Sequence, residues 1–342
     1  DGAARLEAFR ALLAFQMERI PAYGAWVRAR RFEPERMTDW RDAPAVPTAA
    51  FKRVDLFAGE AEEIAHTFTT SGTTGAAKGR AHFSEAGLVL MRAAIEANAE
   101  RFLFPRAERL RILVLAPPPE RAPGMIMAWG MARLIEKYGE AGSGFLLDER
   151  GLDAEALARA LREAEASGAP LCLIGASFAF VHLFDGFEAR GVRFALPPGS
   201  RVMDAGGYKG RSREMTRPEF VERIERFLGA PPARAVNLLG MTELASQFYD
   251  DAMEEPPRAA LKRNPPWTAT AAIHPRTGAA LPHGETGLLR HLDLANLDRP
   301  ACIQTDDLGR THPEGFEVFG RAADDGGRGC SLGVEELLGG AA

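Results

Sequence analysis

The sequence has little cysteine, no long apolar run and no surplus of positive charge. Its three cysteines, Cys172, Cys302 and Cys330, are an odd number in a chain of 342 residues, so we expect no disulfide framework and a reduced, cytoplasmic protein. No apolar stretch is long enough to cross a bilayer, and no secretory signal is expected. The formal net charge of -5 argues against a non-specific nucleic-acid binder, and basic residues form no polybasic membrane patch.

Metal-binding patterns are sparse as well. The seven histidines stand singly, with no HExxH pair and no paired Cys/His spacing, so they predict no resident metal. Hydrophobic residues make up 46% of the chain, which is enough for a sizeable core and argues against disorder. We therefore expect a folded protein of one large domain or two.

Apolar strands and amphipathic helices alternate through the middle of the chain. The clearest helix is "TRPEFVERIERFLG", where Thr216 and Glu219 form a capping box, Pro218 lies in the first turn and Gly229 stops the helix. This alternation predicts a doubly wound α/β fold with a largely parallel sheet. Short strands with Gly/Pro turns then predict a small β subdomain over about 261–320.

One loop gathers glycines, hydroxyls and a lysine: "TSGTTGAAKG", residues 70–79. Glycines allow close backbone approach and hydroxyls add short donors, a combination that suits phosphate oxygens beside the cation Lys78. A Walker A loop is disfavoured, because Lys78 follows Ala77 and precedes Gly79 rather than a magnesium-binding Ser or Thr. The alternative is a flexible Ser/Gly linker, which rarely ends a strand. The predicted nucleotide-binding residues of this loop are Thr70, Ser71, Gly72, Thr73, Thr74 and Gly75.

A second glycine-rich stretch, "GGYKGR" at residues 206–211, follows another predicted strand. That position faces the crevice where an α/β sheet binds its ligand. Gly206 and Gly207 allow close backbone approach, and Lys209 is a second candidate cation for phosphate or carboxylate. The alternative for Lys209 is a solvated turn residue.

The first loop resembles the phosphate loop of the acyl-adenylate-forming enzymes, and further stretches follow in that family's order. "NLLGMTE" resembles the segment whose threonine meets the nucleotide phosphate and whose glutamate helps to hold magnesium. The resemblance implies these roles for Thr242 and Glu243, with Gly240 and Met241 beside the nucleotide. Leu239 stands where the family usually has an aromatic residue.

"QTDDLGR" and "FGRAADD" resemble two later segments of the same family. The resemblance implies that Asp307 binds the ribose hydroxyls and that Arg321 reaches the nucleotide. Taken singly, each charged residue has an alternative interpretation as an ordinary surface charge. The ordered set predicts adenylate formation, in which loop amides and hydroxyls, Lys78 and magnesium neutralise charge on the phosphate oxygens.

Most acyl-CoA ligases continue past the Gly-Arg segment into a mobile lid with a catalytic lysine. Here only a short stretch follows Arg321, so we expect residues 1–320 to form the adenylation domain, residues 321–342 to form a short tail, and the large lid domain to be missing. Lys209 is a candidate substitute for the lid lysine. The architecture and the ending "GRGCSL" resemble acyl-protein synthetases of the LuxE type, which implies that Cys330 accepts the acyl group. Nearby arginines would favour its thiolate, and the alternative is a thiol without a role.

The sequence thus predicts an α/β adenylate-forming ligase that uses ATP and Mg²⁺ to activate a carboxylic acid, with a fatty acid as the expected substrate. The expected catalytic residues are Lys78, Thr242, Lys209 and Cys330, and the acyl group passes from Cys330 to a partner protein such as a reductase with a reactive cysteine. One alternative is an acyl-CoA ligase of the phenylacetate type, for which the cysteine is irrelevant. Another is a non-catalytic nucleotide-binding regulatory subunit.

Overall fold

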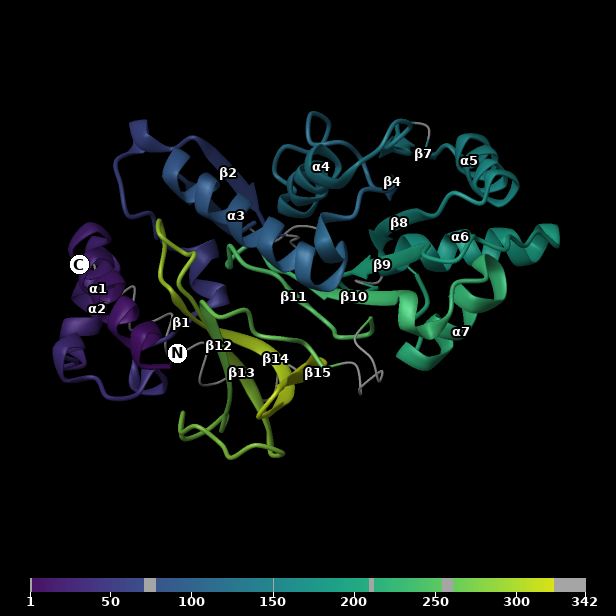
Figure 1. Ribbon diagram of the computed structural model, residues 1–342. Helices are drawn as coiled ribbons and strands as arrows, with labels where there is room; N and C mark the ends of the chain where they lie inside the picture. Colours follow the sequence, from purple (N-terminus) through teal and green to yellow (C-terminus); the bar gives the residue numbers. More distant parts are fainter. Residues whose placement is uncertain (1, 71–77, 150, 209–211, 254–260, 323–342) are drawn as a thin grey trace. The chain divides into compact units, whose positions relative to one another are not determined.

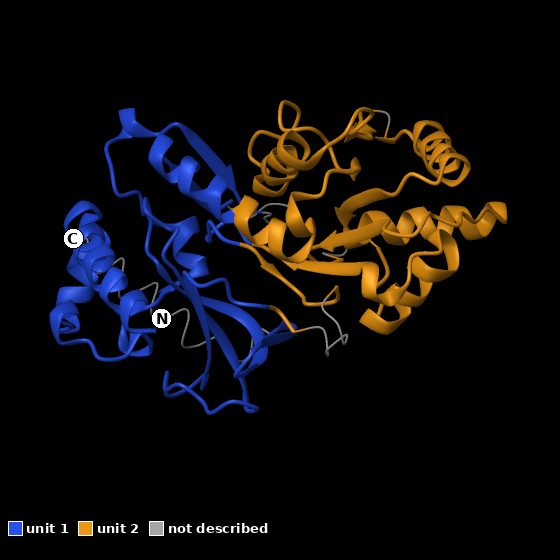
Figure 2. Ribbon diagram, viewed as in Figure 1, with its two compact units in different colours: residues 1–94, 241–246, 263–342 blue, residues 95–240, 247–262 orange. Residues whose placement is uncertain are grey.

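The computed structural model describes most of the chain, and internal contacts divide the chain into two compact units, which Figure 2 colours separately. The described residues are 2–70, 78–149, 151–208, 212–253 and 261–322. Unit 1 comprises residues 1–94, 241–246 and 263–342. Unit 2 comprises residues 95–240 and 247–262. Among the described residues, no helix combines the length and the apolar character that crossing a bilayer requires.

Unit 2 is built on a six-stranded sheet (Figure 1). Its strands are β4 (Arg111–Leu115), β5 (Gly144–Phe145), β8 (Leu171–Ala176), β9 (Arg201–Ala205), β10 (Ala235–Leu239) and β11 (Phe248–Tyr249). The strand order is β11-β10-β9-β8-β4-β5, with parallel pairing from β10 to β5 and an antiparallel β11 at the edge. Every residue of β8 and β9 is buried, as expected for parallel strands covered on both faces. The predicted doubly wound α/β fold is confirmed.

Four helices alternate with these strands, as the sequence pattern predicts. They are α4 (Ile126–Tyr138), α5 (Ala154–Ser167), α6 (Ser177–Arg190) and α7 (Arg217–Leu228). The capping box at the start of α7 is present: the Thr216 hydroxyl accepts the Glu219 N–H, and the Glu219 carboxylate accepts the Thr216 N–H at 2.8 Å. Gly229 ends the helix with a left-handed φ of 69°, which confirms both predicted ends. A small hairpin of β6 (Leu147–Asp148) and β7 (Gly151–Leu152) was not predicted.

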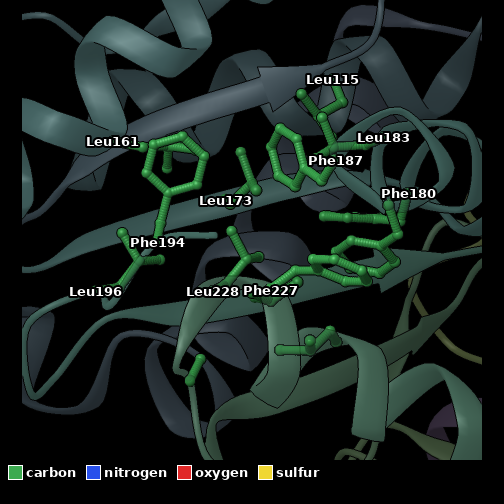
Figure 3. Packing of buried hydrophobic residues seen from close by; sticks show 14 of the residues in the cluster. Leu115, Leu161, Leu173, Phe180, Leu183, Phe187, Phe194, Leu196, Phe227 and Leu228 are labelled. Carbon is green, nitrogen blue, oxygen red and sulfur yellow. The ribbon is translucent and has the colours of Figure 1, made fainter. Parts of the chain in front are cut away.

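The core of unit 2 is aromatic where α6 meets α7 (Figure 3). The Phe184 and Phe227 rings stack with their centroids 5.8 Å apart, and Phe180 meets Phe220 edge to face, also at 5.8 Å. Leucines from the sheet, such as Leu173 of β8, belong to the same cluster. The burial of each side chain of this size contributes about 1.5–3 kcal/mol to the stability of the fold. The cluster therefore stabilises the packing of these helices on the sheet, whose carboxyl edge carries predicted site residues.

Unit 1 is built on a five-stranded sheet made of β1 (Val46–Pro47), β12 (Thr268–Ile273), β13 (Thr286–Asp293), β14 (Cys302–His312) and β15 (Gly315–Arg321). The order is β1-β14-β13-β12, with β15 also paired to β14 (Figure 1). The later strands are antiparallel, as the Gly/Pro turns predict, whereas β1 joins β14 in parallel from a distant part of the sequence. The sequence analysis did not predict β1, because a two-residue strand has no periodicity to detect.

Unit 1 also contains the N-terminal helices and a β-hairpin. The elements are α1 (Gly2–Arg19), α2 (Pro21–Ala29), β2 (His66–Thr69) and β3 (Arg80–Phe83), followed by α3 (Glu85–Phe102), which continues into unit 2. Pro21 follows shortly after the end of α1 and opens α2 at its first position. Short 3₁₀ helices lie at Pro34–Arg36, Trp40–Asp42, Thr48–Lys52, Ala61–Glu63, Pro105–Ala107 and Pro232–Arg234.

Candidate functional site

The glycine loop leaves unit 1 between the antiparallel strands β2 and β3. Thr69 pairs with Arg80 at the loop end of this hairpin. A Walker A loop instead joins a strand to a helix, so the connection supports the exclusion of that class. The hairpin itself was not predicted, because four-residue strands flanking a long loop give little periodic signal.

The neck of this loop is closed by two hydrogen bonds. The Thr70 N–H donates to the Gly79 carbonyl at 2.9 Å, and the Gly79 N–H donates to the Thr70 hydroxyl at 2.8 Å. A Cβ on Gly79 would lie 3.0 Å from the Thr70 methyl group and 3.3 Å from the Phe51 main chain, so only glycine fits without a shift. Lys78 lies beside this neck and is exposed to solvent. The arrangement holds both ends of the loop together and leaves Lys78 exposed, where its ammonium can meet an anion.

Asp307 and Arg321 face each other across β14 and β15. They are register partners, and the Arg321 Nε lies 3.6 Å from the Asp307 Oδ1. Asp307 is largely buried, and burial raises its pKa while the Arg321 guanidinium acts in the opposite direction. Arg321 itself is 83% exposed, so its remaining donors stay available to a ligand. The two residues, predicted from separate motifs, therefore form one acceptor-donor pair in the structure.

Thr242 and Glu243 lie on the segment 241–246, which packs in unit 1 although it follows β10 of unit 2. Both residues are 8% exposed. Burial raises the pKa of the Glu243 carboxyl group, and the positive charges of Arg321 and Arg299 act against this rise, while Asp307 adds to it. In unit 1 the charges of Arg321 and Asp307 therefore lie close enough to Glu243 to act on its carboxyl group.

This constellation fits a magnesium ion that arrives with a nucleotide. Mg²⁺ prefers oxygen ligands and is commonly held by one or two carboxylates together with substrate phosphates. Glu243 supplies a carboxylate whose burial raises its pKa, and a divalent cation would favour its ionised form. In the described part of the chain no group of three or more His, Cys, Asp or Glu side chains could hold a metal by itself, so the phosphates would supply the remaining ligands.

The carboxyl edge of the unit 2 sheet brings Gly206, Gly207 and Gly240 together, because β9 and β10 pair in parallel up to Ala205 and Leu238. Gly206 has a left-handed φ of 73°, a conformation that other residues adopt only with strain. Its carbonyl accepts the hydroxyl of Ser177 at 2.9 Å. Both glycines of the "GG" pair are exposed at this edge, which is where ligands bind in open α/β sheets.

Below these glycines lies a buried polar network centred on Asp204. Its carboxylate accepts hydrogen bonds from the Ser177 hydroxyl at 2.8 Å, from Arg217 at 2.6 Å and from the Asn237 amide at 2.9 Å. Asp204 is 3% exposed, and the three donors come from α6, α7 and β10. The network therefore fixes the end of β9 relative to its neighbours, and with it the "GG" pair.

Lys262 extends this network in unit 2. Its ammonium donates to the Asn237 carbonyl at 2.6 Å and lies 3.9 Å from the Asp250 carboxylate. Burial lowers the pKa of Lys262 to about 8, and burial raises the pKa of Asp250. Asp250 also accepts the Asn237 N–H at 3.0 Å, so the strand that leads into Gly240 is held by both partners of a buried ion pair.

The structure places the predicted site residues in three groups. Unit 1 holds Thr70, Lys78, Met241, Thr242, Glu243, Asp307 and Arg321. Unit 2 holds Gly206, Gly207 and Gly240. Outside the described residues lie Ser71, Gly72, Thr73, Thr74, Gly75, Lys209 and Cys330.

The other two cysteines are buried in strands and have a packing role. Cys172 lies in β8 and Cys302 in β14, and both are 0% exposed. Burial raises the pKa of Cys172 to about 12 and that of Cys302 to about 11, so neither is a nucleophile at neutral pH.

The residues of the turn that holds the segment 241–246 through hydrogen bonds were not predicted from the sequence. Asn296, Asp298 and Arg299 occupy the turn between β13 and β14, and all three are buried. The stretch "NLDRP" is strongly polar and lies between apolar strands. Such a stretch is ordinarily a surface loop, so nothing in the sequence indicates that its side chains are buried. A cavity of about 790 Å³ lies elsewhere in unit 1 beside Trp26, Arg276 and Arg290, and none of the predicted site residues lines it.

Comparison with known sequences gives one family and two curated relatives. The family model described as "Acyl-protein synthetase, LuxE" matches residues 8–339. A long-chain-fatty-acid–luciferin-component ligase of Vibrio harveyi is 26% identical over 314 residues, which cover 89% of this chain and 80% of the relative. The ligase of the same name from Aliivibrio fischeri is 23% identical over 310 residues, with 87% and 79% covered.

Solved structures of similar fold are adenylate-forming ligases. 2-Hydroxyisobutyryl-CoA ligase in an open conformation, in complex with 2-HIB-AMP and CoA, has a TM-score of 0.67 at 16% identity, covering 94% of this chain and 70% of that one. ATP-bound MatB from Rhodopseudomonas palustris has a TM-score of 0.54 at 16% identity, covering 77% of this chain and 49% of that one. At these identities the likeness establishes the fold, and it confirms the predicted fold class.

Proposed function

The chain belongs to the LuxE family of acyl-protein synthetases, and on this premise we propose that it activates a long-chain fatty acid with ATP and carries the acyl group on Cys330 to a partner protein. The family and the fold make the chain an ATP-dependent acyl-adenylate-forming ligase. The names of the two curated relatives support a long-chain fatty acid as the substrate. The single observation that supports the site assignment best is that unit 1 gathers Thr242, Glu243, Asp307 and Arg321 from three separate motifs.

The first step joins the acid to the nucleotide. A carboxylate oxygen of the fatty acid attacks the α-phosphorus of ATP, the bond from that phosphorus to the β-phosphate bridging oxygen breaks, and pyrophosphate leaves. The exposed ammonium of Lys78, at the closed neck of the glycine loop, offsets charge on the phosphate oxygens. Asp307 accepts the ribose hydroxyls, and Arg321 donates to the nucleotide beside it. Magnesium, held by Glu243, supplies Lewis-acid neutralisation of phosphate charge when it is bound.

The second step moves the acyl group to the protein. The Cys330 thiolate attacks the carbonyl carbon of the acyl adenylate, the carbon–oxygen bond to phosphate breaks, and AMP leaves with the electron pair. A thiolate of the partner, for which a reductase cysteine has the right chemistry, then attacks the thioester carbonyl carbon, the carbon–sulfur bond to Cys330 breaks, and the Cys330 thiolate is regenerated. This route needs no CoA.

Intact-protein mass spectrometry tests the proposal. The protein is incubated with ATP, Mg²⁺ and fatty acids of graded chain length, and pyrophosphate release is measured in parallel. We expect a mass gain of one acyl group that hydroxylamine removes, that Cys330→Ser abolishes and that the neighbouring Ser331→Ala variant retains.

The same experiment separates the alternatives. Pyrophosphate release without an adduct in the wild type would reject the carrier role, and acyl-CoA formation that survives Cys330→Ser would establish a CoA ligase instead. Nucleotide binding with no acid-dependent pyrophosphate release would establish the regulatory alternative.

A further inference from the structure

The turn between β13 and β14, residues 294–300, is joined to the segment 241–246 by hydrogen bonds. The Asn296 amide donates to the Glu243 carbonyl at 3.0 Å, and its oxygen accepts the Ala245 N–H at 2.8 Å. Asp293, at the end of β13, accepts both the N–H and the hydroxyl of Ser246, at 2.7 and 2.8 Å. The main chain around Glu243 is therefore held along its length by side chains that the proposed reaction does not use.

Arg299 of this turn makes two contacts that single it out. Its Nε donates to the Glu243 carbonyl at 3.2 Å, so this oxygen accepts from two side chains. Its guanidinium lies over the Phe83 ring at 3.7 Å from the ring centroid, at the end of β3. Arg299 is 1% exposed, and its Nη2 finds no hydrogen-bond partner among the described residues. One buried cation thus connects the hairpin of the glycine loop with the Thr242–Glu243 segment.

The charges around Arg299 are acidic. Burial lowers its pKa to about 10, and the nearby carboxylates of Asp293, Asp298 and Glu243 act against this fall. At that pKa the guanidinium remains protonated at neutral pH. A buried guanidinium is costly, and an apolar side chain of the same volume packs at lower cost, so packing alone does not explain an arginine here.

Two further anchors keep the turn in place. Gln16 of α1 is 0% exposed; its amide donates to the carbonyls of Asn296 and Arg299 at 2.6 Å each, and its oxygen accepts the Ala301 N–H at 3.0 Å. Asp298 accepts the N–H and the hydroxyl of Ser84, both at 2.8 Å, at the start of α3. Arg299 is therefore held from both sides, which a residue that orients another group requires.

We propose that Arg299 is a positioning residue for adenylate formation, which fixes the main chain of Glu243 and thereby the position of the carboxylate proposed to hold magnesium. The inference rests on the proposed function. Groups that orient a metal ligand without touching the metal typically alter metal affinity or activity by about 10–100-fold when they are removed. The loss of Arg299 should therefore appear in the magnesium dependence of the reaction rather than in the affinity for the fatty acid.

The test compares Arg299→Met and Arg299→Lys with a matched control, Arg201→Met. Arg201 is also 1% exposed, but it lies in unit 2, where it donates to Glu108 at 2.6 Å. Acid-dependent pyrophosphate release is measured against Mg²⁺ and against fatty-acid concentration, at a temperature where circular dichroism shows each variant folded. The Mg²⁺ dependence of ATP binding is measured separately by isothermal titration calorimetry without fatty acid, and it should shift in the same direction as the Mg²⁺ dependence of the rate. We expect Arg299→Met to raise the Mg²⁺ concentration for half-maximal rate about tenfold or more, with the fatty-acid KM within about twofold of wild type.

The conservative variant and the control make the result decisive. Arg299→Lys keeps a donor and a charge, so its Mg²⁺ requirement should fall between wild type and Arg299→Met, and this variant still answers the question if Arg299→Met does not fold. Arg201→Met should keep the wild-type Mg²⁺ requirement even if it lowers the melting temperature as much. A Mg²⁺ requirement unchanged in every folded Arg299 variant would overturn the inference. A wild-type protein that releases no pyrophosphate would instead reject the proposed function, and the inference with it.

Discussion

His291 provides a quantitative test of the β sheet that carries Asp307 and Arg321. It lies in β13, is 0% exposed, and shares a hydrogen bond of 2.9 Å between its Nδ1 and the Thr270 hydroxyl. Burial lowers its pKa from 6.5 to about 3. We predict that His291→Asn, whose amide reaches the same hydroxyl but does not titrate near neutral pH, makes the protein less sensitive to acid.

The magnitude follows from proton linkage. The folded-state pKa lies below the unfolded value of 6.5, so the unfolded chain binds more protons between about pH 3 and 6.5. The free energy of unfolding therefore falls as the pH is lowered through that window, with a limiting slope of about 1.4 kcal/mol per pH unit. Between pH 7 and pH 5 the contribution of His291 amounts to a loss of about 2 kcal/mol. The asparagine variant lacks this contribution, although the smaller side chain lowers its stability at every pH.

The assay is equilibrium urea unfolding of wild type and variant at pH 7 and pH 5. For each protein, the change in the free energy of unfolding between pH 7 and pH 5 is determined. We expect this change to be about 2 kcal/mol larger in the wild type than in the variant. Comparing the two changes cancels the loss of packing, because that loss is the same at both pH values. His283→Asn is the matched control, because His283 is exposed and its Nδ1 shares a 3.0 Å hydrogen bond with the Thr311 hydroxyl. Equal pH dependence in wild type and His291→Asn would refute the argument that His291 stays neutral in the folded protein.

Four further substitutions test other parts of the structure. Gly87→Ala places a Cβ 1.7 Å from the hydrogen-bonded Asp298 carboxylate and should lower the free energy of unfolding, measured by urea titration, by about 1–3 kcal/mol. Gly186→Ala is the matched control: its Cβ would meet no atom within 4 Å, so the free energy of unfolding should rise by up to about 1 kcal/mol. Lys262→Met leaves a buried carboxylate without its cation and should destabilise by about 3–5 kcal/mol, measured by urea unfolding at pH 7; a loss under 1 kcal/mol would contradict the ion pair. Arg321→Gln removes an exposed charged donor and should raise the KM for ATP about tenfold or more in the pyrophosphate assay, with unchanged stability.

Features with a local cause were predictable from the sequence. The capping box of Thr216 and Glu219 and the left-handed Gly229 arise within one helix, so their residue types suffice to locate both ends. The parallel sheet of unit 2 follows from alternating periodicity, which the chain repeats several times. The resemblance named Asp307 and Arg321 separately, and their pairing on adjacent antiparallel strands became visible only in the structure.

Features that depend on distant contacts were not predictable. β1 is two residues long and exists because Val46 and Pro47 pair with β14, far along the chain. Gln16 lies in α1 and gives no sign in the sequence that it holds the turn at residues 296–301. No local propensity distinguishes such a glutamine from an ordinary polar helix residue, since its partners become visible only in the folded chain.

The segment 241–246, which carries the "GMTE" motif, depends on hydrogen-bond partners that the motif itself does not reveal. β10 ends at Leu239 in unit 2, yet from Met241 the chain packs in unit 1. A short segment without helix or strand hydrogen bonds must satisfy its buried main-chain groups elsewhere, and each unmet group would cost about 1–3 kcal/mol. Asn296, Asp293 and Arg299 provide these partners. The main chain of the segment 241–246 is therefore held by side chains far along the sequence, as the proposed positioning role of Arg299 requires.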